Sequence, residues 1–157
     1  MKILVPVDGS NASINAVKKA IEIARKYNYS IKLISIVKSM DNKRNENLWS
    51  SVDGSIIVEN EELNKNYEKR NKENFEKLLN SIVSKLDFNG IKVELDVLLG
   101  EPYSIITETA KKENFDLIIM GSRGFSKIKR FFVGSVTQRV ISEAPCPVLV
   151  IRSDFED

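Results

Sequence analysis

Residues 2–10 read Lys-Ile-Leu-Val-Pro-Val-Asp-Gly-Ser, and this stretch contains the pattern that decides the fold. A short, continuous apolar run that ends in a turn is typical of a parallel strand covered on both faces. Ser10 or Asn11 can cap a helix, and apolar residues then recur at helical spacing from Ala12 to Tyr27. The stretch therefore predicts a buried strand that leads directly into an amphipathic helix.

The same alternation of strand and helix continues along the chain. Further strands are expected at residues 31–37, 91–99, 116–120 and 146–152, and further helices at about 58–86, 102–113 and 135–143. This order predicts an α/β protein with a five-stranded parallel sheet between two layers of helices. Right-handed crossovers make it a doubly wound, Rossmann-like or flavodoxin-like sheet with strand order 3-2-1-4-5.

Two segments of this pattern carry further expectations. The long helix is expected to bury an apolar stripe, which comprises Leu63, Tyr67, Phe75, Leu78, Leu79, Ile82, Val83 and Leu86. The polar residues 39–57 before it are interpreted as a variable surface loop. Trp49 lies in that loop, and we expect it to pack on the domain or on a partner chain rather than on a ligand.

Composition limits the classes of protein that this sequence can encode. Its 157 residues suit a single domain, 1–157, and the net charge of +2 is spread along the chain, which argues against a nucleic-acid or membrane-surface partner. One cysteine excludes an internal disulfide, and no apolar stretch of about 18 residues occurs, so we expect a cytoplasmic protein. Without histidine, the chain alone can build neither a Ser-His-Asp triad nor a histidine metal site.

The segment with the most chemical content begins where the fourth strand ends. Gly121 and Gly124 follow a buried run, and Gly134-Ser135 precede the last helix. Glycines allow a backbone to approach a phosphate chain closely, and a helix N-terminus offers free N–H groups to an anion. The same residues are also compatible with a tight turn in which Ser135 is only a helix cap. Neither a Walker A motif nor the dinucleotide G-x-G-x-x-G is present.

The sequence resembles the universal stress protein family, specifically its ATP-binding branch. The branch motif G-x2-G-x9-G-S/T is met by Gly121, Gly124, Gly134 and Ser135. The resemblance extends from the opening strand and turn at 3–10, through 100–102 and 116–124, to the end at 145–151. It implies ATP as the ligand, with Mg²⁺ bound through the phosphates.

The resemblance also implies the residues of the binding site. The adenine and ribose are expected to contact Pro6, Val7, Asp8, Val37 and Met120, and the phosphates Gly121, Arg123, Gly124, Gly134, Ser135 and Val136. The carboxylate of Asp8 has a second interpretation as a cap of the first helix. Arg123 has a second interpretation as a solvated surface residue.

The family further implies a homodimer that pairs the last strand, residues 146–151, across a two-fold axis. A short, apolar edge strand of this kind tends to be covered or paired. Cys146 lies between two prolines and is interpreted as a small packed residue rather than a redox site.

A phosphate-binding loop without catalytic equipment favours a nucleotide-binding regulatory protein that acts as a ligand-dependent switch with an unidentified protein partner. No catalytic residue and no protein metal site is predicted. The alternative is a slow or partner-dependent ATPase, in which Asp8 or Glu101 would position metal or water. A phosphorelay receiver is disfavoured, because a lone Asp8 follows the first strand and the third ends at Leu99-Gly100.

Overall fold

The computed structural model describes residues 1–39, 54–123 and 133–152, with residues 54–61 described by their backbone alone. Trp49 and Gly124 lie outside the described residues. Five parallel strands form one sheet in the order β3-β2-β1-β4-β5, as the sequence predicts. The elements are β1 (Lys2–Pro6), α1 (Asn11–Tyr27), β2 (Ser30–Val37), α2 (Gly54–Lys85), β3 (Val93–Leu99), α3 (Pro102–Lys112), β4 (Leu117–Gly121), α4 (Ser135–Glu143) and β5 (Val148–Ile151).

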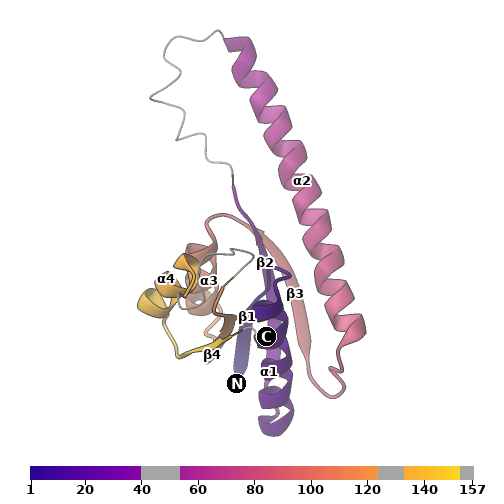
Figure 1. Ribbon diagram of the computed structural model, residues 1–157, viewed down its shortest axis with the longest axis vertical. Coiled ribbons are helices and arrows are strands. Elements are labelled where there is room, and N and C mark those ends of the chain that lie inside the picture. The colour runs from indigo at the N-terminus through magenta and orange to yellow at the C-terminus, as the bar shows by residue number, and fades with distance from the viewer. Residues whose placement is uncertain (40–53, 124–132, 153–157) are drawn as a thin grey trace, which may run out of the picture.

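The four helices cover the sheet in two pairs (Figure 1). Helices α1 and α2 pack on one face with Ile3, Val5 and Leu33, and α3 and α4 cover the other face with Leu4 and Ile34. Ile3, Leu4 and Val5 of β1 point alternately to opposite faces and are all buried, which is why the apolar run at 3–5 is continuous. From β1 the chain crosses through α1 to β2 on one side, and from β4 it crosses through α4 to β5 on the other side.

The caps of α1 are those that its sequence allows. Ser10 is the N-cap residue, and its Oγ accepts a hydrogen bond from the Ser13 N–H at 3.3 Å. Asn28 ends the helix in the left-handed conformation at φ 56°, a conformation that asparagine tolerates better than most residues. The interpretation of Asp8 as the cap of this helix is therefore wrong.

Helix α2 differs from its prediction at its N-terminal end. It begins at Gly54, so the expected surface loop cannot extend to residue 57. The β-branched residues Ile56, Ile57 and Val58 favoured a later start, but extending an existing helix is far easier than nucleating one. The helix also projects beyond the carboxyl ends of the strands (Figure 1), and Leu63 and Tyr67 are 65% and 46% exposed rather than part of the buried stripe.

The last strand is shorter than predicted, because Cys146 and Pro147 precede it. Proline has no N–H to donate to a ladder, and the Pro147 carbonyl instead accepts from the Ile118 N–H at 3.0 Å. Cys146 packs against the core on the α3 and α4 side, and burial raises the pKa of its thiol. Among the described residues, no helix is long and apolar enough to cross a membrane.

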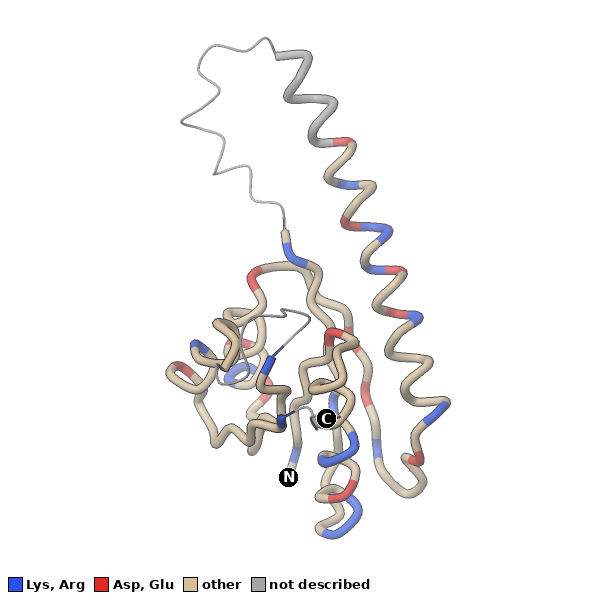
Figure 2. The backbone as a smooth tube through the Cα atoms, viewed as in Figure 1, with Lys and Arg blue, Asp and Glu red and all other residues tan. Residues whose placement is uncertain are grey.

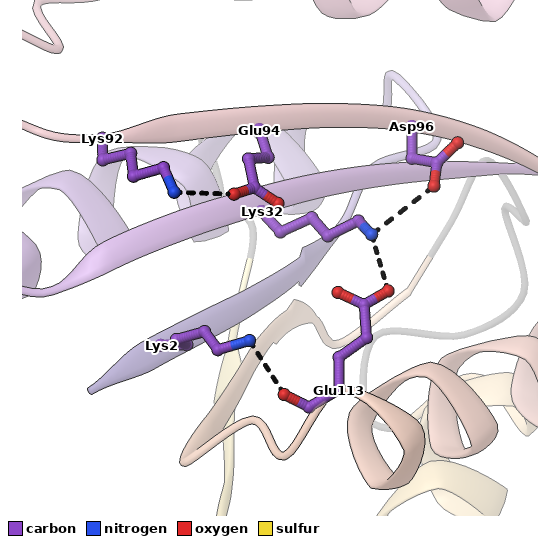
Figure 3. A network of polar contacts seen from close by, with 6 residues as sticks. All are labelled: Lys2, Lys32, Lys92, Glu94, Asp96 and Glu113. Carbon is purple, nitrogen blue, oxygen red and sulfur yellow. Dashed lines mark hydrogen bonds and ion pairs between the residues drawn. The ribbon is translucent and has the colours of Figure 1, made fainter.

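A network of charged side chains joins the strand edges to the end of α3 (Figure 3). Lys32 Nζ lies 2.7 Å from Glu113 Oε1 and 3.5 Å from Asp96 Oδ2, and its side chain is 12% exposed. Lys2 Nζ donates to the Glu113 carbonyl at 2.8 Å. Burial lowers the pKa of Lys32, but the hydrogen bond and charge of Glu113 and the charge of Asp96 together raise it above its ordinary value.

We expect Lys32→Gln to lower the free energy of unfolding by about 1–2 kcal/mol near neutral pH, between the values for exposed and fully buried ion pairs. Because the pKa of Lys32 is raised on folding, its contribution is complete below the unfolded value of 10.5 and is lost as pH rises through the folded value. Urea unfolding at neutral and increasingly alkaline pH should therefore show the two proteins converging. If the difference in free energy of unfolding between wild type and Lys32→Gln stayed constant with pH, the charge of Lys32 would not stabilise the fold.

Candidate nucleotide-binding site

A pocket of about 200 Å³ lies at the carboxyl ends of β1 and β4. These strands are neighbours, with Ile3 opposite Leu117 and Leu4 opposite Ile118, although their crossovers lead in opposite directions. A switch point of this kind leaves a crevice that is the usual ligand site of open α/β sheets. The pocket therefore lies where the strand order alone predicts a site.

Most of the expected site residues meet at this pocket. Seven of them line it, namely Pro6, Val7, Asp8, Met120, Gly121, Arg123 and Val136. Gly134 and Ser135 do not line it, but they form the N-terminus of α4, next to Val136. The remaining lining residues were not among the expected ligand contacts: Ser13, Ile36, Phe75, Pro102, Ile106 and Thr137.

Val37 does not line this pocket, and the β2 residue that does is Ile36. Neighbouring residues of a strand point to opposite faces. Ile34 and Ile36 pack with the core on the α3 and α4 side, whereas Val37 is buried at 4% exposure and lines a separate hollow beneath α2. Strand alternation counted from the buried Ile34 could have identified Ile36.

Asp8 is held at the pocket by the turn that follows β1. Its Oδ1 accepts hydrogen bonds from the Ser10 N–H at 2.9 Å and from Ser10 Oγ at 2.6 Å. Ser10 Oγ also lies 3.3 Å from the Arg123 carbonyl oxygen. The hydroxyl group of Ser10 therefore connects the turn after β1 to the chain that leaves β4, and both segments border the pocket.

The chain after β4 is tied to the start of α4. The Gly134 N–H donates to the Ser122 carbonyl at 2.8 Å, and Thr137 Oγ1 donates to the Gly121 carbonyl at 3.0 Å. The Ser122 N–H donates to the Ile151 carbonyl at 2.7 Å. These bonds fix the first turn of α4 beside the pocket, and the N–H groups of a first turn lack partners within their own helix.

The two described glycines of the motif have different structural roles. A Cβ at Gly121 would lie 2.9 Å from Ala12 C and Cβ and from Ser13 N, so glycine there lets α1 pack closely on β4. A Cβ at Gly134 would meet only Ser122 O at 3.5 Å and Arg123 Cα at 3.6 Å, which are ordinary contacts. The fold therefore requires Gly121, whereas a Cβ at Gly134 would be tolerated at the N-terminus of α4.

Of the two carboxylates that the ATPase alternative offers, Asp8 or Glu101, one lies at the pocket. Glu101 does not line it, and its Oε2 lies 3.7 Å from Lys38 Nζ. Asp8 is the one carboxylate among the described lining residues, and its Oδ1 is already engaged by Ser10. Of the two carboxylates that the sequence offers for this alternative, Asp8 is therefore the one that lines the pocket.

Together, the fold and the pocket define a doubly wound α/β protein with a ligand pocket at its topological switch point. The model of the universal stress protein family matches residues 1–152, and the chain belongs to that family. A universal stress protein from Methanocaldococcus jannaschii is 33% identical to it over 153 residues, which are 96% of this chain and 81% of the relative.

Solved structures share the architecture. The structure of hypothetical protein MJ0577 matches with a TM-score of 0.79 and 26% identity, covering 99% of this chain and 97% of that one. Two more distant structures share the fold. A universal stress protein in complex with cAMP matches at 19% identity and TM-score 0.66, covering 98% of each chain. A family member from Arabidopsis thaliana with AMP bound matches at 20% identity and TM-score 0.58, covering 98% and 92%.

Proposed function

We propose that this chain binds an adenine nucleotide, ATP foremost, in the pocket between β1 and β4, and acts as a ligand-dependent regulatory switch. The observation that carries the proposal is that Asp8, Met120, Gly121, Arg123 and Val136 line one pocket beside the N-terminus of α4. Family members that contain cAMP and AMP support a nucleotide as the ligand class.

The size and chemistry of the pocket indicate how a nucleotide would lie. A volume of about 200 Å³ is below the roughly 300–1,000 Å³ of pockets that enclose a whole drug-sized ligand. The apolar side chains of Ile36, Ile106 and Met120 suit the base, and Asp8 suits the hydroxyl groups of a ribose. The phosphates would then extend toward the first turn of α4, where N–H groups and the helix dipole favour anions. Mg²⁺ would bind through these phosphates.

Such a ligand would contact both helical layers at once. Asp8 leads into α1 and Val136 belongs to α4, so the two ends of the ligand would fix these helices relative to each other. A protein partner that recognises this end of the molecule would then distinguish the liganded from the free form.

Calorimetric titration tests the proposal. Mg²⁺-ATP should bind wild type with micromolar affinity, adenosine should bind more weakly, and inorganic triphosphate more weakly still, because each retains only part of the contacts. A folded wild-type protein that gives no binding heat with ATP and no competition between ATP and adenosine would refute it.

We also propose a homodimer that pairs through β5. The two edges of the sheet are β3 and β5. Charged residues block β3, where Glu94 and Asp96 alternate with exposed Leu95, whereas β5 consists of four uncharged aliphatic residues. Charges on edge strands oppose pairing, so the uncharged edge is the one available for it.

We expect Leu149→Lys to weaken dimerisation by at least about tenfold, because the two-fold axis would bring like charges together on adjacent strands. Leu149 is 36% exposed, so the substitution should leave the fold intact. Leu95→Lys on β3 is the matched control, since Leu95 is 38% exposed on the other edge. Sedimentation velocity measures both proteins. Equal effects of the two substitutions, or a monomeric wild type, would contradict pairing through β5.

A further inference from the structure

A second hollow, of about 280 Å³, lies between α2 and the carboxyl ends of β2 and β3. It shares no lining residue with the pocket between β1 and β4. Its apolar floor is formed by Val37, Val97, Leu98 and Leu99, and the side toward α2 is lined by Lys65, Glu68, Lys69 and Lys72. The Gly100 N–H donates to the Val37 carbonyl at 3.0 Å and joins the two strand ends that make the floor.

The lysines lie on the face of α2 that is turned toward the sheet, where an amphipathic helix normally carries apolar residues. Residues three and four apart share one face of a helix. Toward the C-terminus of α2, Leu79 and Ile82 are buried against the sheet at 1% and 5% exposure. The same face continued toward the N-terminus reaches Lys72, Glu68 and Lys65, so the inward stripe changes from apolar to charged where it passes over the hollow. Figure 2 shows acidic and basic residues along this N-terminal part of α2.

The lysines that line the hollow have no ion-pair partner among the described side chains. Lys32, Lys38 and Lys92 each form an ion pair with a described carboxylate. Within the part of the chain whose side chains are described, Lys65, Lys69 and Lys72 form none. Three lysines face one glutamate, so the rim carries excess positive charge above an apolar floor in which Leu99 is 50% exposed.

We propose that this hollow binds a small amphipathic anion, with its apolar body on the floor of Val37, Val97 and Leu99 and its carboxylate or phosphate head among the lysines of α2. A purely inorganic anion would leave the floor exposed, and a neutral apolar molecule would leave the lysines without a counter-charge. The volume corresponds to about nine groups of the size of a water molecule, which matches an eight-carbon chain with its head group.

Titration calorimetry with octanoate and octyl phosphate tests the proposal, with octylammonium as the probe of opposite charge. Wild type should bind one or both anions, and the stronger of the two identifies the preferred head group. It should not bind octylammonium. Affinity should increase by roughly fourfold for each methylene added from hexanoate to octanoate, and should fall as salt increases.

Substitutions locate the site. The double variant Lys69→Gln/Lys72→Gln should weaken binding by about tenfold or more, whereas Lys77→Gln, an exposed lysine of α2 outside the hollow, should leave it unchanged. Leu99→Glu should abolish binding by placing a carboxylate on the floor. All substituted side chains are exposed, so folding should persist, which circular dichroism verifies.

Two results would overturn the proposal. One is a wild-type protein that binds none of the anions. The other is binding that the Lys69→Gln/Lys72→Gln and Lys77→Gln variants reduce equally, since that would reflect a general charge effect. Binding of ATP to the first pocket should be unaffected by the double variant, so failure at either site is distinguishable from failure at the other.

Discussion

Replacement of Gly121 by alanine is expected to lower the free energy of unfolding by about 3 kcal/mol, the upper part of the range for overpacked cores. The new Cβ would lie 2.9 Å from Ala12 C, Ala12 Cβ and Ser13 N. Two of these atoms belong to the backbone of α1, so no change of side-chain rotamer can relieve the contact. The first turn of α1 would have to move away from β4.

Urea unfolding of wild type, Gly121→Ala and Gly134→Ala measures this effect. Gly134→Ala is the matched control, because its Cβ meets only ordinary contacts at 3.5 and 3.6 Å. Alanine is a poorer N-cap than glycine, so we expect the control to lose about 1 kcal/mol or less. A Gly121→Ala protein as stable as the control would show that α1 does not pack on β4 as closely as described.

Gly134→Val is expected to weaken ATP binding by about a hundredfold, or roughly 2.7 kcal/mol, with little effect on the fold. A Cβ at residue 134 would meet only ordinary contacts, and the valine side chain would lie at the N-terminus of α4, where a phosphate is expected. Adenosine carries no phosphate, so its affinity should be the same for both proteins.

Calorimetry with ATP and adenosine separates this effect from general damage. Equal losses for the two ligands would mean that valine distorts the pocket rather than obstructing a phosphate. Undiminished ATP affinity would place the phosphates away from α4. Gly134→Ala should give an intermediate loss, because it adds a single carbon atom to the same space.

Much of the fold could be predicted because local signals agree with one another. The apolar run at 3–5 is buried on both faces, and Ser10 caps the helix that follows it. A parallel sheet of alternating strands and helices then leaves few possible topologies. The boundaries of α1 agree with the sequence because Ser10 caps its start. Helix α4 also begins at Ser135 as predicted, although its N-cap residue is Gly134 and Ser135 is its first helical residue.

The sequence prediction and the structure differ where the outcome depends on which face of a strand or helix a residue occupies. Val37 and Ile36 are equally apolar, and a one-residue shift along a strand exchanges the two faces. Leu63 and Tyr67 fit a helical period, but they precede the part of α2 that contacts the sheet and are exposed. Phe75 was expected only in the core stripe, yet it reaches the pocket from a distant segment of the chain, which no local pattern indicates.

The glycine motif shows a similar limit. The sequence correctly marks Gly121 as special, and the structure adds a reason that the spacing does not indicate, the close approach of α1. Gly134 has no such steric requirement, and its identity is consistent with the phosphate contact that we propose. Sequence spacing cannot distinguish the two glycines. The atoms that surround Gly121 belong to α1, and those that surround Gly134 belong to the chain after β4.

The most direct test of the proposed function is methyl NMR spectroscopy of the wild-type protein during titration with Mg²⁺-ATP. Ile36, Ile106 and Met120 line the pocket between β1 and β4, whereas Ile82 of α2 does not and is buried in the core shared with α1. We predict shifts of the Ile36, Ile106 and Met120 methyl resonances that saturate together with the binding heat, with Ile82 unchanged. Saturating ATP that leaves the three pocket methyl resonances in place would contradict the account.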